Sequence, residues 1–272
     1  MLQVLLMVRP PAVAGLFYPA EPKELARQID SLCGASARKA ACACVVPHAG
    51  YMYSGHVAGA VYAAIEIPRR CVLLGPRHFP QGQPMAILTE GSFSTPLGEA
   101  AIDAPMAAEL ARACPLLRED ALAHAKEHSL EVQLPFLQKL RPDFTFVPVV
   151  LATDRYGAIE ALGHAVAQVV KARSEPVLLI ASSDMNHYEN DAVTRSKDRR
   201  AVDRILALDP QGLYETVRTE GITMCGYAAT VATLIAAREI GAKEAQLIRY
   251  ATSADINGDR DRVVGYAGIL LT

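Results

Sequence analysis

The chain has 272 residues, a formal net charge of -2 at pH 7, and 51% hydrophobic against 21% charged residues. This length and composition are typical of one globular domain with a large buried core. The near-neutral charge gives no electrostatic basis for binding nucleic acid or an anionic membrane. No apolar run in the sequence reaches the roughly 18 residues that span a bilayer. We therefore expect neither nucleic acid nor a membrane as a partner.

The six cysteines show no CxxC spacing and no regular framework. A chain of this size does not need disulfides for stability, so we expect reduced thiols and a cytoplasmic protein. The first residues, 1–7, are apolar but lack the basic leader and cleavage site of a signal peptide. We expect residues 1–7 to be a disordered or wrongly assigned extension, and residues 8–272 to form one domain.

The first part of the chain alternates between strand-like and helix-like patterns. Three prolines, Pro10, Pro11 and Pro19, make residues 9–19 an extended segment rather than a helix. Periodicity then predicts, in order, a helix (22–32), a strand (41–46), a helix (55–65), a strand (71–74), a short strand (85–89) and a loop with turn residues (92–98).

The alternation continues to the end of the chain. The predicted elements are a helix (105–113), a helical pattern interrupted by Pro135 (129–140), a strand (144–151), a helix (159–172), a strand (177–180), three helices (195–207, 210–219 and 228–240) and two strands (246–253 and 263–270). The turn-rich segment 255–259 predicts that the last two strands are antiparallel. Together these elements predict a single three-layer α/β/α domain with a central mixed, mostly parallel sheet.

Chemically active side chains follow three of the predicted strands. His48 comes after the strand 41–46, His78 after 71–74, and the pair Asp184 and His187 after 177–180. In open α/β sheets ligands bind at the carboxyl ends of the strands, so these side chains are expected at one edge. Cys225 precedes a predicted helix, whose dipole would favour the thiolate. Two imidazoles and one anionic ligand are typical of catalytic zinc or Fe(II) sites.

His187 is the candidate acid–base group, because an imidazole titrates near neutral pH. Asp184 would orient His187 or hydrogen-bond a metal ligand. Glu127 and His128 would add a further acid–base or substrate contact, although the same stretch also fits a capping sequence between a loop and a helix. The predicted substrate pocket is lined by Tyr51, Tyr53, Glu127 and His128.

Six stretches follow one another along the chain in a specific order: Arg9–Pro19, Pro47–Gly55, Leu74–His78, Glu127–Pro135, Ser182–Tyr188 and Met224–Gly226. With this set of stretches the sequence resembles the Memo family, the AmmeMemoRadiSam system protein B group. The resemblance covers the chain from about residue 8 onward. Members of that family have been associated with iron or copper binding and, in eukaryotes, with redox signalling and cell motility.

The resemblance implies a fold similar to the class III extradiol (LigB-type) dioxygenases, which hold non-haem Fe(II) with two His and a Glu. His48 and His78 would take the two His positions, and Cys225 would take the position of the carboxylate. His187 matches the catalytic His of those enzymes, and Asp184 is its companion acid. The resemblance therefore implies Fe(II), with copper or zinc as alternatives, and an association with radical-SAM and AMMECR-type proteins.

Three hypotheses about function remain open from the sequence. The first is a non-haem iron oxidoreductase of dioxygenase type that acts on a small molecule. The second is a metal-free Cys–His hydrolase or transferase with Cys225 as nucleophile. The third is a binding module that keeps the pocket without the chemistry.

Overall fold

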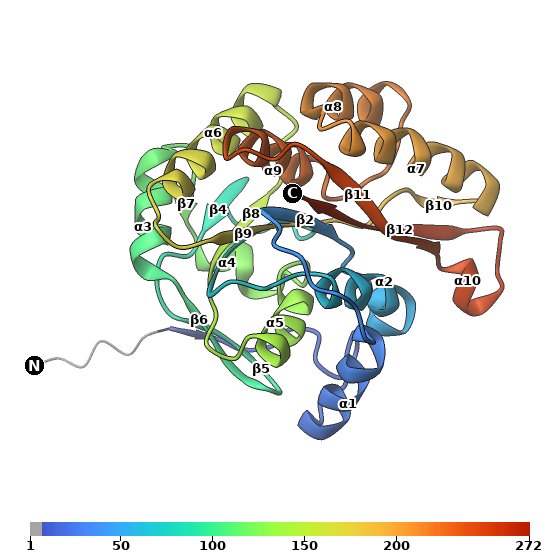
Figure 1. Ribbon diagram of the computed structural model, residues 1–272, viewed down its shortest axis with the longest axis horizontal. Helices are drawn as coiled ribbons and strands as arrows, with labels where there is room; N and C mark the ends of the chain where they lie inside the picture. The colour runs from blue at the N-terminus through green and yellow to red at the C-terminus, as the bar shows by residue number, and fades with distance from the viewer. Residues whose placement is uncertain (1–6) are drawn as a thin grey trace, which may run out of the picture.

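The computed structural model describes residues 7–272 (Figure 1). The expectation about residues 1–7 therefore falls outside the described residues, except for Met7. The strands are β1 (Val8–Arg9), β2 (Ala43–Val46), β3 (Arg70–Pro76), β4 (Met85–Ile87), β5 (Ser92–Thr95), β6 (Gly98–Ile102), β7 (Arg118–Glu119), β8 (Thr145–Leu151), β9 (Val177–Ser182), β10 (His187–Glu189), β11 (Ala245–Thr252) and β12 (Val263–Leu271).

Helices fill most of the connections between these strands. They are α1 (Pro22–Cys33), α2 (Tyr51–Ala63), α3 (Ala104–Ala113), α4 (Ala121–Ala125), the 3-10 turn η1 (Glu131–Gln133), α5 (Leu134–Leu140), α6 (Tyr156–Lys171), α7 (Asp191–Leu206), α8 (Pro210–Thr219), α9 (Tyr227–Glu239) and α10 (Ala254–Asn257). Within the part of the chain that is described, none of them combines the length and apolar character that a membrane crossing requires.

Across residues 7–272 the strands form one mixed sheet in the order β1-β5-β6-β8-β3-β9-β2-β12-β10, with β11 beside β12 and β4 beside β8. The middle of the sheet, from β6 to β2, is parallel. Every residue of β9 is buried, as expected for a parallel strand that is covered on both faces. The apolar runs of the sequence thus form the centre of the core.

Helices cover both faces of this sheet. In Figure 1, α6, α7, α8 and α9 lie above the sheet, and α1, α2 and α5 lie below it. Helix α9 packs directly on β9 and β3, and α2 packs on β2 and β12. The predicted three-layer α/β architecture with a mixed, mostly parallel sheet is confirmed.

The boundaries of several elements differ from the sequence prediction. Helix α2 begins already at Tyr51 rather than at residue 55, with Gly50 as its N-cap. The predicted loop at 92–98 is wrong, because β5 and β6 form an antiparallel hairpin there. Pro135 does not interrupt a helix but lies in the first turn of α5, where its missing N–H costs nothing.

The C-terminal pair is antiparallel, as predicted, and β12 also pairs antiparallel with β2. Helix α7 approaches β12 at Gly265, where a Cβ atom would lie 1.8 Å from Oδ2 of Asp198. Asp198 is fully buried and accepts hydrogen bonds from the Tyr250 hydroxyl (2.6 Å) and the Asn186 N–H (2.8 Å). Burial raises the pKa of Asp198 to about 7, although both hydrogen bonds favour the carboxylate.

Asp198 therefore makes stability depend on pH. Its pKa is higher in the folded chain than the value of about 4 in an unfolded chain, so the stability of the fold falls as pH rises from about 4 to about 7. We expect Asp198→Asn to be more stable than wild type by roughly 2 kcal/mol at pH 8, with no such advantage at pH 4. Urea titrations at both pH values measure the difference. Equal pH dependence of the two proteins would contradict this assignment.

Candidate metal centre

Three adjacent parallel strands deliver side chains to one edge of the sheet. His48 follows β2, His78 follows β3, and Asp184 follows β9, each at the second residue after the strand ends. Strand β9 lies between β2 and β3 and is parallel to both. Their carboxyl ends therefore lie at the same edge of the sheet, and this is the edge at which open α/β sheets bind ligands.

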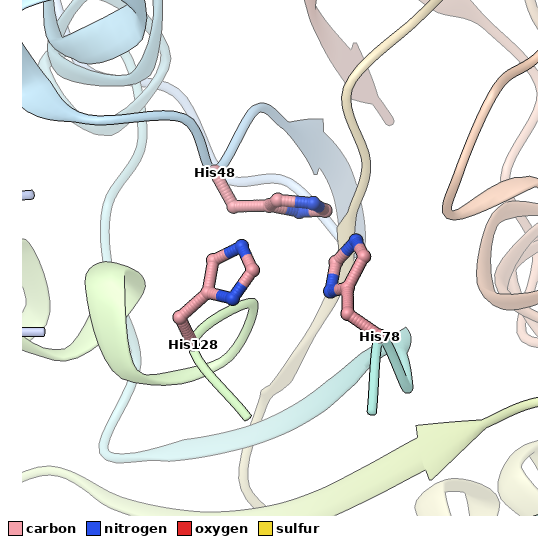
Figure 2. Close-up of side chains that lie close together, drawn as sticks. All are labelled: His48, His78 and His128. Atoms are coloured by element: carbon pink, nitrogen blue, oxygen red, sulfur yellow. The ribbon is translucent and has the colours of Figure 1, made fainter. Parts of the chain in front are cut away.

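A third histidine, His128, joins the two from the strand ends. It comes from the loop before η1, and Figure 2 shows the rings of His48, His78 and His128 around a common space. One ring nitrogen of each lies within 4.8 Å of the others. The ring centroids of His78 and His128 are 4.5 Å apart, and that of His48 lies 5.2 Å and 5.6 Å from them. This group could hold a metal ion.

The hydrogen bonds of Ser182 determine which nitrogen of His48 is free. Ser182 Oγ donates to the Ser129 carbonyl (2.7 Å) and accepts from Gln133 Nε2 (2.9 Å). A hydroxyl has only one proton to donate, so Nδ1 of His48, 2.9 Å away, must be the donor to Ser182 Oγ. The lone pair of His48 is therefore on Nε2, and metal ligands are commonly oriented in this way.

Glu127 orients His78 in the same manner. Glu127 Oε1 lies 2.9 Å from Nδ1 of His78, and Oε2 accepts the His78 N–H at 2.5 Å. Oε1 also accepts the N–H of Ser129 and lies 3.7 Å from Nδ1 of His128. Burial opposes ionisation of Glu127, but the hydrogen bond and charge of His78 and the charge of His128 outweigh it and lower the pKa of Glu127 to about 2. A carboxylate thus holds Nδ1–H of His78 and leaves Nε2 free.

Two of the three imidazoles, those of His48 and His128, are biased toward the neutral form that a metal needs. Burial, and then the proximity of His78 and His128, lowers the pKa of His48 well below its usual 6.5. Burial likewise lowers the pKa of His128. Neutral rings of His48 and His128 present lone pairs at neutral pH, so no proton has to be displaced from these two rings when a cation binds. The donor set therefore fits a divalent transition-metal ion.

Cys225 lies beside this group, with Sγ 3.2 Å from Nε2 of His48. Gly226 allows the backbone next to Cys225 to approach the end of β9 closely, because a Cβ atom at position 226 would lie 2.3 Å from the Ser182 carbonyl oxygen. Asp184 accepts the N–H of His48 at 2.7 Å, and its own N–H lies 3.3 Å from Sγ of Cys225. The effect expected of the helix dipole on Cys225 is outweighed: burial, and then the charge of Asp184, raises the pKa of the thiol well above 9. Without a cation Cys225 is a thiol.

His187 is half-buried at the start of β10, and a positive charge on it would contribute to lowering the pKa of His48. Nδ1 of His187 is 2.9 Å from the Thr223 carbonyl oxygen, and the backbone N–H of His187 donates to Thr223 Oγ1 at 2.7 Å. Thr223 is in turn held by Asn186 Oδ1, which accepts its N–H at 3.0 Å. Because a carbonyl only accepts, Nδ1 carries the proton and Nε2 of His187 is free to take one.

The two tyrosines of the predicted pocket have other contacts. Tyr51 is buried against Tyr18 and Phe136, and its hydroxyl donates to the Val132 carbonyl at 2.7 Å. Its hydroxyl therefore contacts η1, the 3-10 turn that follows the loop with His128. Tyr53 is half-buried and packs against the small cluster around Tyr266. Neither position tests the predicted substrate contact.

Glu127, which orients His78, was among the candidate residues, but Ser182 and Gln133, which orient His48, were not. Both lie inside stretches that carry the family resemblance, and nothing in the spacing indicated a bond between them. Phe17 was also missed, although its ring lies 4.8 Å from that of His128. These contacts join segments that are distant along the chain.

Comparison with known proteins identifies relatives across the whole chain. A family model described as Memo-like protein matches residues 9–270. A MEMO1 family protein of Methanopyrus kandleri is 40% identical, over 97% of this chain and 99% of its own. One from Methanothermobacter thermautotrophicus is 38% identical, over 96% and 99%, and one from Thermoplasma volcanium is 39% identical, over 97% and 98%.

The fold also occurs in a solved structure of an uncharacterized Escherichia coli K12 protein. That chain superposes with a TM-score of 0.52 at 13% identity, covering 84% of this chain and 98% of its own. At this identity the likeness supports the fold alone. The matching family model and the full-length relatives show that this chain belongs to the Memo-like protein family.

Proposed function

We propose that this protein is a metal-dependent oxidoreductase of the dioxygenase type, with Fe(II) as the metal and copper or zinc as the alternatives. The observation that carries the proposal is the convergence of three imidazoles from the ends of β2 and β3 and the loop before η1, two of which are oriented by hydrogen bonds at Nδ1. A bound Fe(II) ion would supply Lewis acidity and one-electron redox chemistry at this edge of the sheet.

The proposed ligands are His48, His78 and Cys225. Nε2 of His48 and Sγ of Cys225 are 3.2 Å apart, so one cation could contact both atoms. The charge of a bound divalent cation would offset the cost of ionising a buried thiol. His128 would be a substrate contact, the role expected from the sequence.

The proposed acid–base group is His187, with Asp184 as its companion. Nε2 of His187 has a free lone pair and can accept a proton from a bound phenol or similar substrate. Asp184 holds the backbone of His48 and Ala49 and thereby links the acid–base pair to the first ligand. The metal-free Cys–His alternative has less support, because the raised pKa of Cys225 disfavours a nucleophilic thiolate.

The family resemblance adds two further proposals, a small-molecule substrate and a functional association with radical-SAM and AMMECR-type proteins. Co-purification of the native protein from its source, under anaerobic conditions, tests the association.

Iron content is the first test of the metal centre. We expect about one iron ion per chain in wild type purified and reconstituted anaerobically, and less than about a tenth of that in His48→Ala. His164→Ala is the matched control, because His164 is exposed on α6 and pairs with Glu239; it should keep its iron. Equally low metal in wild type and His48→Ala, measured by mass spectrometry, would show that this group is not a metal centre.

The second test distinguishes Cys225 from His128 as the third ligand. The Co(II)-loaded wild type should show a thiolate-to-metal charge-transfer band in the near ultraviolet, because a thiolate bound to Co(II) absorbs there. We expect this band to disappear in Cys225→Ser and to persist in His128→Asn and in the control Cys33→Ser. If the wild type lacks the band but loses Co(II) on His128→Asn, the three histidines alone hold the ion and the assignment of Cys225 is wrong.

The third test concerns chemistry. Oxygen consumption by the iron-loaded protein is measured with a panel of catechols and related phenols. We expect His187→Gln to lower the rate at least about 100-fold at unchanged iron content, since the base is lost and the ligands are not. The control His56→Gln should resemble wild type. Iron-loaded wild type that consumes oxygen no faster than His187→Gln with every compound would favour a binding module instead.

A further inference from the structure

The loop that carries Glu127 and His128 is held by an arginine from the other end of the chain. Arg9 is buried, with 5% of its surface exposed. Its Nε donates to the His124 carbonyl at 2.7 Å, and its Nη2 donates to the Glu127 carbonyl at 2.6 Å. The two carbonyls belong to the segment that leads directly into His128. A single planar guanidinium thus fixes two points of that backbone.

The third arm of Arg9 ties the loop to the N-terminal strap, which we define as residues 9–18. Arg9 Nη1 lies 2.6 Å from Oε2 of Glu131, which is fully buried. The same carboxylate accepts the N–H groups of Ala12 (2.8 Å) and Val13 (3.0 Å) and the hydroxyl of Tyr18 (2.6 Å). The carboxylate of Glu131, immediately after the loop, therefore accepts hydrogen bonds from several residues of the strap.

The strap also reaches the metal centre by packing. The ring of Phe17 lies 4.8 Å from that of His128, and the Phe17 carbonyl accepts the N–H of Tyr51 at 2.7 Å, at the start of α2. The strap therefore lies between α2, which follows His48, and the loop that carries His128. A shift of the strap would move the ring of His128 and the carboxylate of Glu127 together.

We propose that Arg9 is a positioning residue of the metal centre. Its fork sets the backbone of the loop from His124 to Glu131, so that Glu127 holds Nδ1–H of His78 and His128 faces the other two rings. This inference rests on the proposed function only in requiring that His48, His78 and their neighbours bind an ion. It assigns to the N-terminal strap a role in metal affinity, although no strap side chain is a ligand.

The variant Arg9→Lys separates this role from the buried ion pair. A lysine keeps the positive charge next to Glu131, but its single ammonium group cannot reproduce the fork that reaches both carbonyls. We expect the dissociation constant for Co(II) to rise about 10–100-fold, the range for loss of groups that orient ligands. The ligand-field spectrum of the Co(II) form should also change, because the angles between the ligands change. Titration calorimetry and absorption spectra measure the two effects.

Arg70→Lys is the matched control. Arg70 also bridges two carboxylates, Asp103 at 2.9 Å and Glu175 at 2.6 Å, but at the opposite end of β3. It should keep the affinity and spectrum of wild type, because Arg70 contacts no residue of the loop from His124 to Glu131. If Arg70→Lys weakens Co(II) binding as much as Arg9→Lys does, or if Arg9→Lys binds like wild type, the positioning role is refuted. Wild type that binds no Co(II) at all would instead refute the metal centre itself.

A milder variant keeps the test decisive if Arg9→Lys does not fold. Tyr18→Phe removes only the hydroxyl that donates to Oε1 of Glu131, so it loosens the strap without leaving a buried charge unpaired. We expect faster hydrogen exchange in residues 124–131 of the metal-free protein, together with weaker Co(II) binding. Unchanged exchange and unchanged binding in Tyr18→Phe would contradict the coupling between strap and loop.

Discussion

The candidate metal centre depends on the hydrogen bonds of the Ser182 hydroxyl. This hydroxyl lies at the end of β9, is fully buried, and uses its proton for the Ser129 carbonyl and its lone pairs for Gln133 and His48. Three segments from different parts of the chain therefore meet at one oxygen. Because all of its hydrogen-bonding capacity is used, the tautomer of His48 follows, and with it the availability of Nε2.

Two buried carboxylates extend this arrangement outward. Glu127 faces the metal centre and holds His78, and Glu131, four positions later, faces away and holds the N-terminal strap. A buried carboxylate is costly unless it is paired and hydrogen-bonded, and each of these has several donors. The short stretch between them thus connects the centre to the N-terminal strap. This explains how the loop that carries His128 stays in place without belonging to a long helix or strand.

Much of the fold follows from the sequence, because its signals are local. The apolar runs at β3, β8 and β9 predicted strands of a mostly parallel sheet, and the turn-rich segment before Val263 predicted the antiparallel pair at the end. The start of α2 at Tyr51 and the hairpin at 92–102 were missed. In both places the local sequence has weak helix or strand propensity. Pairing of β5 with β1 and of β6 with β8 decides the conformation of the hairpin, and packing against the strap decides where α2 begins.

The sequence by itself determined that His48, His78 and Asp184 follow strands, and the parallel order of those strands brings them to one edge because side chains at carboxyl ends share that edge. Only the tertiary structure decided that His128 completes a group with the first two, that Cys225 lies against His48, and that Arg9 supports the loop. The reason is physical. Hydrogen bonds through Ser182, Glu127 and Glu131 join residues separated by up to 134 positions, and no local pattern encodes such a bond.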